Sequence, residues 1–157
     1  MKGRVWRLAL SSMASALAAM SGYLMLPEGR GPTPARAHTN AVTFPPLEKL
    51  EHYTTVRRGV TREHMLTSRA ALDAIKADQA VPTGTHVVLV DYQSDVLHRY
   101  LVAQKMGNGI DDWQYQWFRP DRSIKADENT AQCYACHQRS RRDRQFMFTF
   151  TDALSFK

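Results

Sequence analysis

The sequence predicts an α+β fold, in which short helices flank an antiparallel β-sheet. Three runs of residues carry this prediction. The run "THVVLVDY" at residues 85–92 is rich in β-branched side chains, which is typical of a buried strand. The runs "WQYQWF" at residues 113–118 and "QFMFTF" at residues 145–150 alternate large apolar side chains with other residues, which favours strands. Because the connections between strands are short, we expect neighbouring strands to pair antiparallel.

A first helix is expected near the start of the globular part. Residues 46–53 begin with a proline suited to the first helical turn and place Leu47, Leu50 and Tyr53 at helical spacing. A β-prone stretch at residues 53–56 follows this helix.

A second helix is expected at residues 68–79, with Ser68 as its N-cap. Its inward-facing side chains are expected to be Ala71, Leu72, Ala74 and Ile75. A turn at residues 81–84 then leads into the strand at residues 85–92. An alternating strand at residues 95–105 and a loop at residues 106–112 precede the aromatic strand.

The two cysteines of the chain, Cys133 and Cys136, lie two residues apart near the C-terminus, and His137 follows directly. The polar residues just before them suit a helix N-cap. These are Asp127, Asn129 and Thr130. On a helix, Cys133 and Cys136 occupy positions i and i+3, so both sulfur atoms share a face and the imidazole projects beside them.

Four kinds of chemistry compete for this motif. A structural zinc site needs four ligands, and the chain has no second cysteine pair and no paired histidine spacing. The histidines considered for such a site are His52, His64, His86 and His98. A thioredoxin-like redox motif belongs after an early strand rather than near the C-terminus. A plain disulfide leaves the adjacent histidine unexplained. The motif therefore favours covalent attachment of a c-type haem by both thiols, with His137 as the iron ligand.

The N-terminus predicts export, which this kind of attachment requires. Residues 1–7 are basic and residues 8–26 carry no charge, the pattern of an export signal. Candidate cleavage motifs lie at residues 16–18 and 35–37, and the apolar run also approaches the ~20 residues that span a bilayer. We therefore expect residues 1–37 to be an export signal or an N-terminal membrane anchor with a Pro/Gly-rich tether. The domain at residues 38–157 is expected in the periplasm, soluble or anchored to the inner membrane.

The basic charge of the chain largely belongs to this leader. Of the 21 Lys and Arg and 15 Asp and Glu residues, residues 38–157 keep 16 and 14, so nucleic-acid binding is not indicated. One basic cluster remains after the haem motif, and it either faces solvent or pairs with haem propionates or an acidic redox partner. It consists of Arg139, Arg141, Arg142 and Arg144.

The order of these elements resembles the cytochrome P-460 family, including its sheet-built relative cytochrome c′-beta. The resemblance covers roughly residues 45–150. It rests on an early helix that ends in an aromatic residue, the "VPTGT" turn from a helix into a strand, a W-x-Y strand, and a late C-x-x-C-H followed by an F-x-F run. The resemblance implies a five-coordinate haem with His137 proximal and the opposite face open to a small ligand such as NO or hydroxylamine. It also implies a redox partner and a homodimer formed through the sheet.

In the hydroxylamine-oxidising branch of that family a lysine is bonded to the porphyrin, and Lys76 lies at a similar place, before the turn. Lys76 is thus either a porphyrin cross-link or a surface residue. Two functions stay open on the same haem: an oxidoreductase or binding protein for a small nitrogen compound, and an electron carrier with a sixth side-chain ligand. The first would have an apolar pocket lined by some of Trp113, Tyr115, Trp117, Phe146 and Phe148. The candidates for a sixth ligand are Met65, Met106, Met147, His64 and His98.

Overall fold

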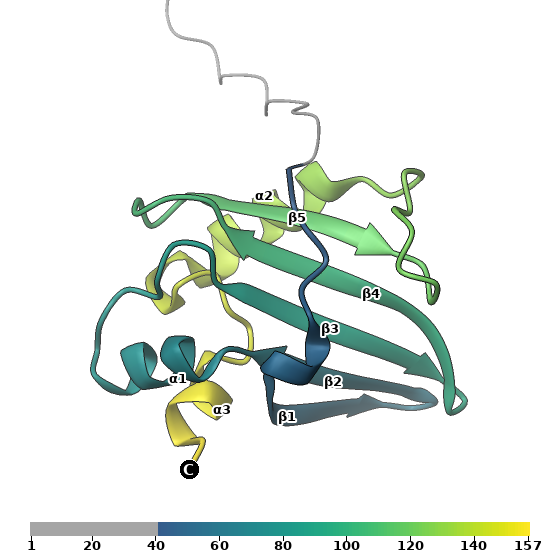
Figure 1. Ribbon diagram of the computed structural model, residues 1–157, viewed down its shortest axis with the longest axis horizontal. Coiled ribbons are helices and arrows are strands. Elements are labelled where there is room, and N and C mark those ends of the chain that lie inside the picture. Colours follow the sequence, from purple (N-terminus) through teal and green to yellow (C-terminus); the bar gives the residue numbers. More distant parts are fainter. Residues whose placement is uncertain (1–40) are drawn as a thin grey trace, which may run out of the picture. The chain divides into compact units, whose positions relative to one another are not determined.

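The computed structural model describes residues 41–157, which form a five-stranded sheet and several short helices (Figure 1). The strands are β1 (Glu51–Arg58), β2 (Thr61–Thr67), β3 (His86–Gln93), β4 (Val96–Lys105) and β5 (Trp113–Phe118). They lie in the order β1-β2-β3-β4-β5, and each strand pairs antiparallel with the next. The predicted α+β fold with an antiparallel sheet is confirmed.

The expected export signal, anchor and tether at residues 1–37 lie outside the described residues, as does the expected domain boundary at residue 38. Within residues 41–157, no helix combines the length and the apolar character that crossing a membrane requires.

The helical segments are η1 (Leu47–Lys49), α1 (Arg69–Lys76), α2 (Thr130–Arg141), η2 (Arg142–Arg144) and α3 (Phe150–Ser155). Two of them begin at predicted N-caps. The Ser68 hydroxyl accepts a hydrogen bond from the backbone N–H of Ala71 at 3.2 Å. The Asn129 side chain accepts one from the backbone N–H of Gln132 at 3.3 Å. Such caps satisfy N–H groups that the first turn leaves without a partner.

The two faces of the sheet are covered by different parts of the chain (Figure 1). α1, α2, α3 and the segment before α3 pack on one face, which we call the helix side. Residues 42–50 cross the other face, which we call the outer side. The buried helix-side core consists of Tyr53, Ala71, Leu72, Ile75, Val81, Val87, Trp113, Tyr115, Phe146, Met147 and Ala153. The buried outer core consists of Val42, Val88, Val90, Tyr100, Val102 and Phe118.

The predicted helix at residues 46–53 is wrong. Only the single turn η1 forms, and β1 begins at Glu51. The apolar residues at helical spacing pack on opposite faces of the sheet: Leu47 and Leu50 contact the outer core, whereas Tyr53 is buried in the helix-side core. A helix could not divide its apolar stripe in this way, so strand pairing overrides the local pattern.

The predicted strand at residues 145–150 is also wrong. Gln145 and Phe146 adopt left-handed backbone conformations, with φ of 50° and 64°, and α3 begins at Phe150. These two residues turn the chain so that the neighbouring side chains of Phe146 and Met147 are both buried. In a strand, consecutive side chains would point to opposite faces. The segment is therefore an irregular wall against the helix side of the sheet.

Sequence reasoning missed the strand β2. Gly59, with φ of +58°, lies between β1 and β2 and lets the chain reverse. β2 carries Glu63 and Met65 toward the helix side and His64 and Leu66 toward the outer side. Its charged and polar residues hide this alternation, because both faces of the strand are only partly buried.

Candidate functional site

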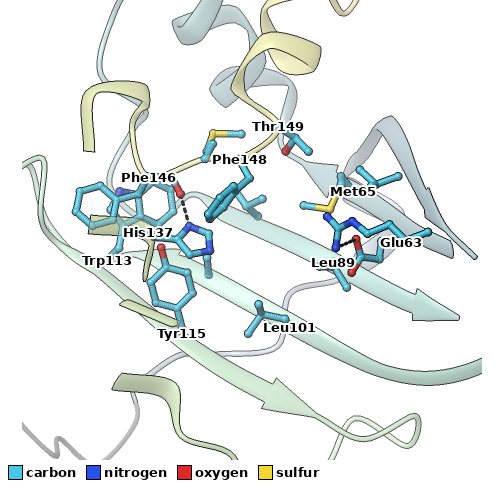
Figure 2. A pocket seen from close by; sticks show the side chains of 15 residues that line it. Glu63, Met65, Leu89, Leu101, Trp113, Tyr115, His137, Phe146, Phe148 and Thr149 are labelled. Atoms are coloured by element: carbon cyan, nitrogen blue, oxygen red, sulfur yellow. Dashed lines mark hydrogen bonds and ion pairs between the residues drawn. The ribbon is translucent and has the colours of Figure 1, made fainter. Parts of the chain in front are cut away.

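A cavity of about 300 Å³ lies on the helix side of the sheet, between the strands and the segment 146–149 (Figure 2). Its volume is at the lower end of the range of about 300–1,000 Å³ that small-molecule pockets occupy. The strands contribute an aliphatic wall of Val56, Met65, Val87, Leu89, Leu101 and Ala103. The aromatic side chains around it are Trp113, Tyr115, Phe146 and Phe148. This lining matches the apolar pocket expected from the sequence, except that Trp117 is not part of it.

His137 projects from α2 into this cavity (Figure 2). Its ring lies 4.8 Å from the ring of Tyr115 and 4.8 Å from that of Phe148, measured between centroids. Its Nδ1 is hydrogen-bonded to the backbone oxygen of Phe146. Because a carbonyl oxygen only accepts hydrogen bonds, Nδ1 carries the proton, and the neutral ring keeps its lone pair on Nε2.

Burial lowers the pKa of His137, the Phe146 carbonyl raises it, and the nearby charge of Arg141 lowers it again. The net direction is downward from the ordinary value of 6.5, so the imidazole is neutral at pH 7. A neutral imidazole with a fixed tautomer is the form that binds a metal ion, and the bond from Nδ1 to a carbonyl is the usual way to orient it.

The two thiols lie on the same helix as this imidazole. Cys133 and Cys136 are free and half-buried. Cys133 and His137 occupy positions i and i+4 of α2, so they share a face of the helix, and Cys133 packs against the helix-side core. Burial raises the pKa of the Cys133 thiol, which keeps it protonated at neutral pH. Neither sulfur lines the cavity itself. Their role in haem attachment stays a prediction.

Trp113 has a side-chain N–H donor that no atom of the described residues accepts. Its side chain is buried and lines the cavity, and its Nε1–H has no hydrogen-bond partner among the described residues. A buried polar group without a partner is costly, so such a group indicates an acceptor that residues 41–157 do not supply. Trp117, by contrast, stacks against the Arg99 guanidinium, whose Cζ lies 4.0 Å from the ring centroid.

Lys76 does not line the cavity. It lies at the end of α1, and its Nζ is 5.7 Å from the ring centroid of Phe156. Among the described residues, no lysine contributes to the lining.

Of the candidates for a sixth ligand, the structure brings only methionines to the cavity. Met65 and Met147 line it. His64 faces the outer side, where it contacts Tyr92, His98 is exposed on β4, and Met106 is 36% exposed in the loop after β4. Within residues 41–157, no group of three or more His, Cys, Asp or Glu side chains comes close enough together to hold a metal ion.

The cavity also contains an ion pair that sequence reasoning missed. Glu63 on β2 pairs with Arg58 on β1, with Oε2 and Nη1 3.4 Å apart, and both residues line the cavity (Figure 2). The side chain of Glu63 is 15% exposed and that of Arg58 70% exposed, so the arginine lies at the mouth. A signal for this placement exists in the sequence, because every second residue from Thr61 to Thr67 would share one face of a strand. The signal has meaning only once β2 is known to be a strand, which the sequence does not predict.

These features fit a haem group. The apolar walls suit a porphyrin ring, His137 offers a neutral nitrogen lone pair for the iron, and the Trp113 N–H lacks an acceptor that a propionate or another polar group would supply. Among the described residues that line the cavity, His137 and Glu63 are the only side chains of the types that usually bind zinc, and a closed structural zinc site uses four.

In a comparison with known protein families, the family described as Cytochrome P460 matches residues 47–149. This stretch is more than half of the chain and contains all five strands, α1 and the C-x-x-C-H motif. No curated protein sequence matches the chain.

Proposed function

Because the chain belongs to the cytochrome P-460 family and is therefore a haem-binding cytochrome, we propose that it carries one c-type haem attached through Cys133 and Cys136. His137 is the proximal ligand, and the opposite haem face is open to a small nitrogen ligand such as NO or hydroxylamine. The observation that carries this proposal is the hydrogen bond from His137 Nδ1 to the Phe146 backbone oxygen, which leaves Nε2 for the iron.

The haem, when bound, supplies an iron that binds small ligands and exchanges electrons. The residues of the chain set which ligands reach it. Leu89 on β3 and Leu101 on β4 line the cavity, as do the Tyr115 and Phe148 rings that flank His137 (Figure 2). An aliphatic wall favours neutral diatomic molecules over water and anions, because it gives a charged or strongly hydrated ligand no hydrogen-bond partner. Glu63, held by Arg58, is the one carboxylate among the described residues that line the cavity.

The second candidate is a six-coordinate electron carrier, and the presence of Met65 in the cavity supports it. Methionine is a common axial ligand of electron-transferring c-type haem. The test is the rate at which the ferrous protein binds NO, measured by anaerobic stopped-flow mixing. With an open site the rate rises in proportion to NO concentration, both in the native protein and in Met65→Leu. If Met65 ligates, the native rate saturates at the rate of methionine dissociation, and Met65→Leu removes the saturation. Met106→Leu, outside the cavity, is the control.

We further propose that Lys76 is not bonded to the porphyrin, because it lies against Phe156 and does not line the cavity. Peptide mapping is expected to find the Lys76 peptide free, and Lys76→Ala is expected to leave the ferrous spectrum unchanged. A Lys76 peptide joined to the haem peptide of Cys133 and Cys136, with ferrous absorption shifted far to the red, would show the opposite.

The expected partner is an acidic redox protein in the periplasm, to which we propose the chain is exported. Two of the four arginines after the haem motif have a place in the fold: Arg142 pairs with Asp111 at 2.9 Å, and Arg141 lies over the Phe148 ring at 4.3 Å. Arg139 and Arg144 are exposed and are the side chains we assign to partner recognition. The expected homodimer stays a prediction.

A further inference from the structure

Two imidazole nitrogen atoms and one hydroxyl oxygen lie close together on the outer side of the sheet, opposite the cavity that contains His137. His52 Nε2 and His64 Nδ1 are 3.1 Å apart. The hydroxyl oxygen of Thr55 lies 2.9 Å from the first and 3.0 Å from the second. The three atoms therefore form a nearly equilateral triangle. The contact of His64 with Tyr92, which packs against the outer core, places this triangle on the outer side.

A β-bulge builds this triangle. His52 pairs with Leu66 and Thr54 with Met65, so Tyr53 is an extra residue in β1. In a regular strand His52 and Thr55, three positions apart, would point to opposite faces. The bulge brings both to the outer side, where Thr55 is directly opposite His64. Tyr53 itself stays buried on the helix side. The bulge therefore brings His52 and Thr55 to the same face of the sheet, which a regular pairing of β1 with β2 would not do.

The spacing of the triangle is that of donors around one metal ion. Imidazole nitrogen binds first-row metals at about 2.0–2.1 Å, and two such ligands about 90–100° apart lie roughly 3 Å from each other. The two ring centroids are 4.9 Å apart, so the rings spread away from their closest nitrogen atoms. His52 is exposed and His64 half-buried, which leaves the site open to an ion from solvent.

The charges around the pair limit which ion can bind. Burial lowers the pKa of His64, and His52, Arg62 and Arg57 lower it further. The ring is therefore neutral at pH 7, as a ligand must be, but the arginines oppose a cation. Part of the charge of Arg62 is balanced by Asp95, 3.1 Å away. Only an ion with a strong preference for imidazole would overcome this repulsion, and among divalent first-row ions that preference is greatest for Cu²⁺.

We propose that His52, His64 and Thr55 form a surface site for a divalent transition-metal ion, with Cu²⁺ as its best occupant. The two imidazoles are the strong ligands, Thr55 is a weak third ligand, and water completes the coordination. Among the described residues, no further His, Cys, Asp or Glu side chain joins the pair to make a larger set. The site lies on the face of the sheet opposite the cavity that we propose for the haem.

The test is titration of the haem-loaded protein with Cu²⁺ at pH 7, followed by electron paramagnetic resonance and calorimetry. All variants carry His38→Ala, because His38 could otherwise bind copper near a processed N-terminus. The expected result is one copper site with two equatorial nitrogen ligands. This site is expected to be lost in His52→Ala and in His64→Ala, and kept in Thr55→Val with weaker affinity. His98→Ala, which removes an exposed histidine on β4, is the matched control and is expected to keep the site.

An unchanged haem spectrum shows that each variant is folded. The proposal is overturned if the parent protein binds no Cu²⁺, because the triangle is then a hydrogen-bond network only. It is equally overturned if the same copper signal persists in both His52→Ala and His64→Ala.

Discussion

A Cys133→Ala, Cys136→Ala double variant is expected to lose all haem that resists acid–acetone extraction. In the proposed attachment, each thiol would form a thioether by adding its sulfur and its proton across a haem vinyl group, so no oxidant is needed and only another cysteine could replace it. The chain has no further cysteine. The measurement is the pyridine haemochrome spectrum of the protein pellet after extraction.

The two single variants are the controls for this experiment. Each keeps one thiol on α2 and is expected to retain some extraction-resistant haem through one thioether, with a shifted haemochrome band. Haem that survives extraction in the double variant would contradict attachment at these cysteines.

His137→Ala is expected to remove the proximal ligand while both thioethers keep the haem attached. The Soret band should change, and added imidazole should restore it, since the space left by the side chain adjoins the cavity. Restoration requires neutral imidazole, so the experiment is done at about pH 8, above the ordinary histidine pKa. The absorption spectrum before and after imidazole addition is the measurement.

His98→Ala is the matched control, because His98 is exposed on β4 and does not line the cavity. Its spectrum should equal that of the native protein. If His137→Ala instead keeps the native Soret band, the proximal ligand is another residue.

Local signals in the sequence predicted much of the fold. The strand at residues 85–92 and the aromatic strand both form, and α1 and α2 begin at capping residues that the sequence identifies. A β-branched run and a side-chain cap depend on neighbours within a few residues, so they can be recognised without the rest of the chain.

The failures share a physical cause, which is that distant contacts decided the structure. β2 is a strand because it pairs with β1 and β3, not because of its own composition. The run at residues 145–150 has the alternation of a strand. The left-handed backbone conformations of Gln145 and Phe146 nevertheless make it an irregular segment that packs against the sheet. Nothing in the local sequence reveals those backbone angles.

The same distinction between local signals and distant contacts applies to the candidate site. The cysteines and the histidine were recognised from their spacing, and α2 carries them as a cap and helix pattern would predict. Glu63 and the Phe146 carbonyl were missed, because both reach the cavity through elements whose structure was not predicted. The bulge at Tyr53 was equally invisible, since it exists only relative to the register of β2.

The absorption spectrum of the dithionite-reduced protein, before and after addition of CO, tests the central claim most directly. That claim is a haem held by His137, with no side-chain ligand on the opposite face. It predicts a high-spin ferrous spectrum and a large Soret shift on CO binding. A low-spin ferrous spectrum that neither CO nor NO changes would contradict it, and would assign the sixth position to a side chain such as Met65.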